Sequence, residues 1–214
     1  MTIKMRSIFT ITLIWGLFCR GHALICNQCI PVTYPWQCTN TESACGTGSC
    51  GSMTVTTYNS WIRVLSMNFK TCLPPEQCIT GTLNFGFGTT ATVSTACCKT
   101  DLCNSQDTPE LNTNTTLNGR KCFTCHLGHD CKQSISCQGN EDRCMKTAID
   151  VYGEMITAKG CASSSLCRAN LSAQLGSMSE NLNCCEGDLC NGAKHVGGGV
   201  LLLLGSVVSV LVFH

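Results

Sequence analysis

Apolar residues gather at the two ends of the chain and are sparse between them. Residues 8–18 and 200–213 are mostly apolar, whereas Leu, Ile, Val and Phe are thinly spread from Leu24 to Asn191. In that middle part the apolar positions come in short runs rich in Thr, Val and aromatic residues, which is typical of β-strands. The pattern predicts a small all-β protein with two apolar terminal segments.

The clearest runs predict hairpins. Residues 53–58 are rich in Thr and Val, and residues 61–70 alternate, interrupted by Arg63, with Asn59 and Ser60 as the turn between them. Four residues of the second run would share one face: Trp61, Leu65, Met67 and Phe69.

Two further hairpins follow. Residues 80–87 and 89–96 predict one, with Gly86 and Gly88 near its tip, and residues 144–151 and 155–158 predict another around 152–154. Residues 167–184 fit either a strand or a short helix.

Composition explains how so few apolar residues could hold a fold. The chain has 21 Cys among 214 residues, which marks a disulfide scaffold. Charged residues make up 13% and the net charge is +1, so the clustered positive charge that a nucleic acid requires is missing. The thin core and dense crosslinks argue against a large enzyme core.

The N-terminal segment, residues 1–23, is typical of a signal peptide. Lys4 and Arg6 precede the apolar run, and residues 21–23 form a small-x-small cleavage site, so the mature chain would begin at Leu24. The competing interpretation is a membrane anchor, for which the run is short. Cleavage removes Cys19 and leaves an even number of cysteines.

The C-terminal segment has the order of a glycolipid (GPI) attachment signal. Small residues at 191–193 are followed by a brief polar spacer, a glycine-rich joint and the apolar tail. We expect the lipid on Asn191 or Gly192, with residues 192–214 as the removed propeptide. The competing interpretation is a transmembrane helix over residues 196–213, although no Lys or Arg follows it as an anchor.

The cysteines form two copies of one ladder. Both ladders have ten members, four of the gaps between neighbours are identical, and both end in Cys-Cys-x-x-Asp-Leu-Cys-Asn, at residues 97–104 and 184–191. This is an internal duplication. It predicts a first domain over residues 24–104, a linker over residues 105–119 without Cys, and a second domain over residues 120–191.

Domains of this size rarely fold on an apolar core alone. Five bridges in each, at roughly 2–4 kcal/mol apiece, would supply more than a typical net stability. Adjacent Cys97 and Cys98 are expected to bond different partners, because a ring between neighbours is strained.

The start Leu24-x-Cys26-x-x-Cys29, the ladder and the shared ending resemble the lymphocyte-antigen/urokinase-receptor superfamily of three-finger (LU) domains. The resemblance covers the mature chain twice, apart from the linker, and the two-domain arrangement looks like the urokinase-receptor group and the serum phospholipase inhibitors. It implies two tandem, all-β, snake-toxin-like domains, each with three hairpin fingers on a disulfide knot. It also implies that the Asn after the last Cys, Asn104 and Asn191, locks each knot through backbone hydrogen bonds.

The resemblance further implies ten disulfides. In the first domain these are Cys26–Cys50, Cys29–Cys38, Cys45–Cys72, Cys78–Cys97 and Cys98–Cys103. In the second they are Cys122–Cys144, Cys125–Cys131, Cys137–Cys161, Cys167–Cys184 and Cys185–Cys190.

Two patterns near the start of the second ladder suggest cofactors. Cys122-Phe-Thr-Cys125-His126 formally matches c-type haem attachment, and Cys125, His126, His129 and Cys131 could form a zinc quartet. In an oxidising compartment these thiols should already be disulfides. With no free Cys and no Gly-x-Ser-x-Gly elbow, we expect no cofactor, no metal and no enzyme.

Two sequons, at Asn114 in the linker and Asn170 in a finger, predict N-glycosylation.

Without catalysis, the fingers would work by contact. Aromatic residues concentrate in the first domain, and large aromatics dominate protein interfaces. We therefore expect a partner-binding face that includes Trp36, Trp61, Phe85 and Phe87. The alternative is that some of these residues form the core or pack the two domains together.

The leading interpretation is a GPI-anchored binding protein on the extracellular face of the plasma membrane: a receptor, co-receptor or adhesion module that recognises a protein partner. The alternative is a secreted inhibitor or modulator resembling the serum phospholipase inhibitors or the neurotoxin-like channel modulators.

Overall fold

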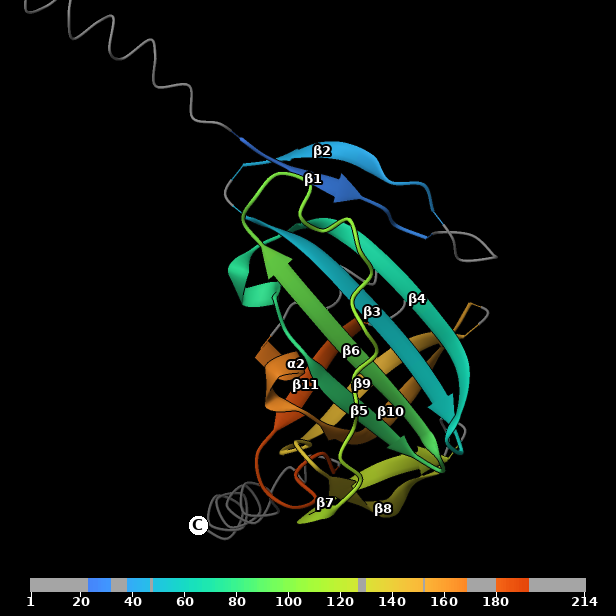
Figure 1. The fold of residues 1–214 in the computed structure, drawn as a ribbon. Helices are drawn as coiled ribbons and strands as arrows, with labels where there is room; N and C mark the ends of the chain where they lie inside the picture. The colour runs from blue at the N-terminus through green and yellow to red at the C-terminus, as the bar shows by residue number, and fades with distance from the viewer. Residues whose placement is uncertain are drawn as a thin grey trace, which may run out of the picture. The chain divides into compact units, whose positions relative to one another are not determined.

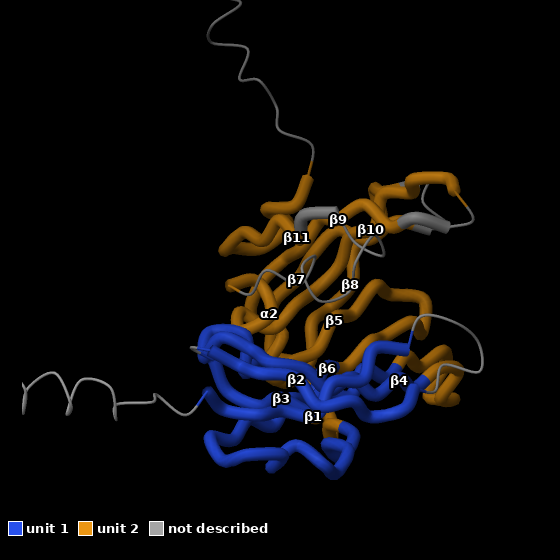
Figure 2. Tube along the Cα trace, turned by 90° about the horizontal axis from the view of Figure 1, so that it is seen from above, with its two compact units in different colours: residues 1–56, 66–79, 93–110 blue, residues 57–65, 80–92, 111–214 orange. Residues whose placement is uncertain are grey.

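The fold is organised as two compact units, drawn in different colours in Figure 2. The computed structural model describes residues 23–31, 38–46, 48–126, 130–151, 153–168 and 180–192. Unit 1 comprises residues 1–56, 66–79 and 93–110, and unit 2 comprises residues 57–65, 80–92 and 111–214. The units therefore do not follow the two cysteine ladders, because residues 57–65 and 80–92 of the first ladder belong to unit 2.

The described residues are almost entirely β-structure (Figure 1). The first ladder contains β1 (Leu24–Gln28), β2 (Thr41–Cys45), β3 (Ser49–Asn59), β4 (Ile62–Leu73), the short 3-10 helix η1 (Pro75–Gln77), β5 (Gly81–Gly86) and β6 (Thr89–Cys98). The second contains β7 (Leu117–His126), β8 (Asp130–Gln138), β9 (Arg143–Val151), β10 (Glu154–Ala162), α2 (Ser164–Arg168) and β11 (Glu180–Cys185). The predicted all-β, disulfide-rich class is confirmed.

The structure contains all three predicted hairpins, with one shift in a turn. The turn between β3 and β4 is Ser60–Trp61 rather than Asn59–Ser60, so Trp61 does not continue the alternation of β4. Met67 and Phe69 are buried and Leu65 is half-buried, as the alternation predicts, whereas Trp61 is exposed. In the region left open as strand or helix, the described residues form both: α2, which begins before Cys167, and β11.

Unit 1 has a small core built largely of sulfur. Strands β1 and β2 pair antiparallel from Leu24↔Cys45 to Gln28↔Thr41. The unit 1 portions of β6, β3 and β4 lie side by side in that order. Cys26, Cys45 and Cys50 form a buried cluster, and the largest side chain with almost no exposure in this unit is Leu73.

The segment predicted as the start of the linker is packed in unit 1. Thr108 is buried, its N–H and hydroxyl donating to Oγ and the carbonyl of Ser52 at 3.1 and 2.6 Å. Lys70 reaches the Asp107 carboxylate at 2.9 Å. Residues 117–119 of the predicted linker are the first residues of β7. The side chains of Asp107 and Thr108 bond to β4 and β3, which composition alone does not reveal.

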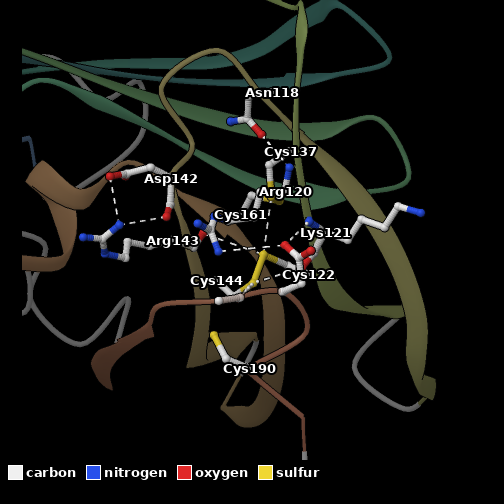
Figure 3. A network of polar contacts seen from close by, with 12 residues as sticks. Asn118, Arg120, Lys121, Cys122, Cys137, Asp142, Arg143, Cys144, Cys161 and Cys190 are labelled. Carbon is white, nitrogen blue, oxygen red and sulfur yellow. Dashed lines mark hydrogen bonds and ion pairs between the residues drawn. A yellow bond between two sulfur atoms is a disulfide. The ribbon is translucent and has the colours of Figure 1, made fainter.

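Unit 2 contains the two-stranded β7–β8 sheet and a sheet ordered β11-β9-β10-β5. Cys122, Cys137, Cys144 and Cys161 are its buried cluster, drawn with the surrounding polar residues in Figure 3. Met145 and Leu166 are fully buried. Among the described residues, no helix has both the length and the apolar character needed to cross a membrane.

A first-ladder strand, β5, is built into the sheet of unit 2. It pairs antiparallel with β10 through Asn84↔Cys161 and Leu83↔Ala162. The Ser163 N–H donates to the Thr82 carbonyl at 2.9 Å, and the Thr82 N–H donates to Ser163 Oγ at 3.0 Å. A side chain at Gly160 would overlap the Asn84 carbonyl oxygen, so the strands approach this closely only because Gly160 lacks a Cβ.

Candidate interaction site

Four large apolar side chains are exposed at or next to the tips of two hairpins in unit 2. The exposed fraction is 74% for Trp61, 69% for Ile62, 58% for Val64 and 47% for Phe87. We refer to these four residues as the tip cluster. Exposed apolar surface concentrated in this way marks sites of interaction, because covering it releases ordered water.

The turns that carry the cluster are held in a costly conformation. Ser60, Trp61 and Phe87 have φ values of 49°, 70° and 50°. A two-residue turn with positive φ at both positions suits the twist of a hairpin, but Asn-Gly is the sequence that normally occupies it. Each other residue costs about 1–2 kcal/mol there. Such strain concentrates at functional sites, where the surrounding structure maintains it.

The two turns are also tied to each other. The Ser60 N–H donates to the Gly88 carbonyl at 2.9 Å. A Cβ on Gly88 would lie 2.8 Å from Ser60 Oγ, and Gly88 has φ +80°, so this position requires glycine on two grounds. The hydrogen bond therefore sets the Trp61 and Phe87 turns side by side.

The residues predicted for a binding face differ in how exposed they are in the structure. Trp61 and Phe87 are exposed and lie on neighbouring turns. Phe85 is half-buried, and its backbone carbonyl accepts a hydrogen bond from the Thr124 hydroxyl. Trp36 lies outside the described residues, as do Asn170, residues 1–22 of the predicted signal peptide and the C-terminal tail after Gly192.

Ile62 and Val64 belong to this surface although sequence reasoning did not select them. They occupy the face of β4 opposite to Met67 and Phe69. The signal was present in the alternation, because apolar residues on the outward face of a half-buried strand have no core to join.

A polar groove of about 570 Å³ opens next to Trp61 and is lined only by residues of unit 2. Its walls are Thr80 with the start of β5, Thr90 and Thr92 of β6, residues 111–115, residues 138–142 at the β8–β9 turn, and Ser163–Ser165. A second hollow of about 320 Å³ shares Trp61 and is lined also by Phe87 and Ile135. The Trp61 side chain therefore borders two depressions as well as belonging to the tip cluster.

Two carboxylates reach the groove, and both have partners. Glu141 is 4% exposed, and its Oε2 accepts hydrogen bonds from the Gln138 N–H at 2.8 Å and the Asn84 side-chain amide at 3.3 Å. Burial raises the pKa of the Glu141 carboxyl above its usual range, against the opposing effect of these hydrogen bonds. Asp142 accepts from the Ser164 N–H at 2.7 Å and pairs with Arg143 at 3.0 Å.

The same asparagine lock closes both disulfide knots. Asn104 accepts from the Asn27 N–H and donates to the Asn27 and Gly51 carbonyls, each at 2.9 Å. Asn191 accepts from the Phe123 N–H at 2.9 Å and donates to the Phe123 and Met145 carbonyls at 2.9 and 2.8 Å. Both side chains are buried, so each knot is closed by an amide that reaches three backbone groups.

The disulfides of the structure are the ten pairs that the family resemblance implies. In unit 1 they are Cys26–Cys50, Cys29–Cys38, Cys45–Cys72, Cys78–Cys97 and Cys98–Cys103. In unit 2 they are Cys122–Cys144, Cys125–Cys131, Cys137–Cys161, Cys167–Cys184 and Cys185–Cys190.

This pairing bears on the haem and zinc patterns. Cys122, Cys125 and Cys131 are bonded to other sulfurs, and a haem thioether or a zinc site requires them as free thiols or thiolates. Cys122, Cys137 and Cys161 bring their sulfur atoms within 4.8 Å of one another, but this is the packing of two disulfides. His129 lies outside the described residues.

Comparisons with known proteins agree with the two ladders. The u-PAR/Ly-6 domain family matches residues 22–106, and the family of snake toxin and toxin-like proteins matches residues 120–191. Among curated proteins, the urokinase plasminogen activator surface receptor of Aotus trivirgatus is 30% identical over 105 residues, covering 44% of this chain and 31% of that protein. Lymphocyte antigen 6D of Homo sapiens is 29% identical over 76 residues, covering 35% of this chain and 59% of that protein.

Both matches span less than two thirds of the relative's own length. Among solved structures, that of mouse TEX101 aligns with 77% of this chain and 97% of its own at 15% identity and a TM-score of 0.29.

Proposed function

Because the chain belongs to the lymphocyte-antigen/urokinase-receptor superfamily of three-finger domains, we propose that it is a GPI-anchored binding protein of the extracellular cell surface. It recognises a protein partner through the tip cluster and performs no catalysis. Residues 24–104 and 120–191 are its two domains, joined by residues 105–119.

The exposure of the tip cluster carries this proposal. Trp61, Ile62, Val64 and Phe87 keep about half to three quarters of their surface in water, on turns that are strained rather than relaxed. An aromatic pair with aliphatic neighbours has the composition of the centre of a protein interface. Nearby carboxylates are engaged in hydrogen bonds or ion pairs within the protein, which suits contact better than acid–base chemistry.

The membrane attachment follows from the two ends of the sequence. The leader at residues 1–23 directs secretion, and the segment from Asn191 to His214 has the order of a lipid-attachment signal. We favour Gly192 over Asn191 as the attachment residue. Asn191 is 5% exposed and locks the knot, so a lipid on Gly192 is bonded one residue beyond this buried side chain rather than to the locking residue itself.

Phosphatidylinositol-specific phospholipase C tests the anchor on intact cells that express the full chain. Release of the protein into the medium is expected, and the C-terminal peptide should carry the glycolipid remnant on Gly192. Spontaneous secretion of protein without lipid would contradict the anchor and favour the soluble inhibitor or modulator.

Cell-surface crosslinking tests the binding face. Wild type is compared with a double variant, Ile62→Thr with Phe87→Asn. The threonine keeps the β-branched shape, and asparagine tolerates the left-handed backbone of position 87. Met155→Thr removes an equally exposed apolar residue from the β9–β10 hairpin and is the matched control. We expect a partner captured by wild type and control but lost from the double variant. Retention by all three would refute the tip cluster as the binding face.

A further inference from the structure

The polar groove beside Trp61 contains a glycosylation sequon in its wall. Asn114, the acceptor of Asn114-Thr115-Thr116, is exposed and lines the groove together with Thr115. Trp61 lines the same groove with an indole that is 74% exposed. An attachment point for sugar and an open aromatic surface therefore face one depression.

The backbone of the sequon is held in place against the β8–β9 turn. The Gly139 N–H donates to the Thr116 carbonyl at 2.9 Å, and the Thr116 N–H donates to Asn114 Oδ1 at 2.9 Å. Gly139 has φ +47°, and a Cβ there would lie 2.6 Å from the Asn114 carbonyl oxygen. This close approach fixes where a glycan would begin, while the Nδ2 that would carry it has no hydrogen-bond partner among the described residues.

The walls of the groove match the chemistry of an uncharged sugar. An aromatic ring offers a flat apolar surface for the C–H face of a pyranose. Threonine, serine and asparagine side chains both donate and accept hydrogen bonds, as sugar hydroxyls and N-acetyl groups require. Only two of the described lining residues are charged, Glu141 and Asp142. Carboxylates repel an anionic ligand but not a neutral one.

The volume of the groove and the covalent attachment of the glycan to its wall also favour a sugar as the occupant. At about 570 Å³ the groove lies in the range of about 300–1,000 Å³ that small ligands occupy. A glycan bonded to the wall is present at a high effective concentration, so weak stacking suffices to keep it there.

We propose that Asn114 carries an N-linked glycan whose innermost N-acetylglucosamine residues lie in this groove against the indole of Trp61. The sugar then covers one side of Trp61, which is one member of the tip cluster, and leaves Ile62, Val64 and Phe87 outside its footprint. The inference does not depend on the identity of a protein partner.

The test uses the full chain made in a mammalian secretory host with 13C-labelled N-acetylglucosamine. Mass spectrometry of the peptide with Asn114 should find it glycosylated, and Thr116→Ala should abolish the modification. After trimming to the innermost sugars, NMR should show Overhauser contacts between the N-acetyl methyl group and the indole of Trp61, with upfield-shifted sugar resonances. Trp61→Ala should remove both signals, and Trp61→Phe should retain an upfield shift.

A second measurement compares the rate of glycan removal by a glycosidase under native conditions. Stacking on Trp61 should slow release from wild type about threefold to tenfold relative to Trp61→Ala. Met155→Ala is the matched control, because Met155 is an exposed apolar residue outside the tip cluster and does not line the groove. Mass analysis of the disulfides verifies that each variant has folded.

Three results would overturn the inference. The first is an unmodified Asn114 in the secreted protein. The second is a glycan on Asn114 that shows no contact with the indole and is removed by the glycosidase as fast from wild type as from Trp61→Ala. The third is binding of free chitobiose to the groove of Asn114→Gln, while the glycan of the wild-type protein does not occupy the groove. The last result would assign the groove to sugar on another molecule. Each is distinguishable from failure of the proposed function, which is tested at Ile62 and Phe87.

Discussion

The side-chain amide of Asn84 donates a hydrogen bond to Glu141 Oε2 at 3.3 Å, joining a strand of the first cysteine ladder to a turn of the second. The Gln138 N–H donates to the same oxygen at 2.8 Å. This carboxyl therefore lies where β5 enters the sheet of unit 2.

Glu141 makes the stability of unit 2 depend on pH. Burial raises the pKa of its carboxyl in the folded protein above the ordinary value of 4.5. The folded state then holds the proton more tightly than the unfolded state. The protonated Glu141 carboxyl therefore contributes fully to the free energy of unfolding below pH 4.5, and this contribution is lost as pH rises through the folded-state pKa.

We expect Glu141→Gln to remove this dependence, because an amide keeps an acceptor for Gln138 and Asn84 without a charge to bury. The free energy of unfolding of the variant minus that of wild type should become more positive from pH 4.5 to neutral pH. Calorimetry at several pH values measures this difference. Glu154→Gln, an exposed position, controls for the change in net charge. A difference that does not vary with pH would contradict the assignment.

Asn104→Ala should destabilise the first domain by about 2–4 kcal/mol. The substitution leaves the buried Gly51 carbonyl and the half-buried Asn27 N–H and carbonyl without their partner. An unsatisfied buried group costs about 1–3 kcal/mol, and a half-buried one costs less because water reaches it. Asn104→Asp should not rescue it, since a carboxylate would face two carbonyl oxygens. Thermal unfolding and secreted yield measure the effect. An aspartate variant as stable as wild type would show that the donated bonds contribute little.

Trp61→Gly should be more stable than Trp61→Ala by about 1 kcal/mol. Both variants remove the indole, but only glycine relieves the left-handed backbone at φ 70°, part of that gain being offset by its greater freedom in the unfolded chain. Denaturant unfolding of the two variants gives the comparison directly. Equal stability would mean that the turn stores no strain.

Gly160→Ala should loosen β5 from β10 at a cost of about 1–3 kcal/mol, because the new methyl group overlaps the Asn84 carbonyl oxygen. Hydrogen exchange of residues 81–88 should speed up, while β1 and β2 remain protected. Gly46→Ala is the matched control, since a Cβ there meets nothing within 4 Å and its φ is not in the left-handed range. Unchanged exchange in β5 would refute the role of Gly160.

The repeated ladder made the family and the number of domains accessible without coordinates. Cysteine spacing is local along the chain, and the shared ending from Cys97 to Asn104 and from Cys184 to Asn191 points to the same knot twice. The lock formed by Asn104 and Asn191 was expected from the family resemblance that this ending carries, not from the spacing itself. Hairpins were likewise visible, since alternation and turn residues are local signals.

The strand pairing and the exposure of each hairpin could not be predicted from these local signals. Nothing local in residues 80–87 indicates that β5 pairs with β10, because that pairing needs Gly160, seventy-odd residues away, to lack a side chain. The exposure of Trp61 depends on a turn displaced by one residue, and the burial of Glu141 depends on the contact between β5 and the β8–β9 turn. Covalent spacing and strand periodicity are written along the chain, whereas exposure and pairing between distant strands arise only when the folded chain brings those segments together.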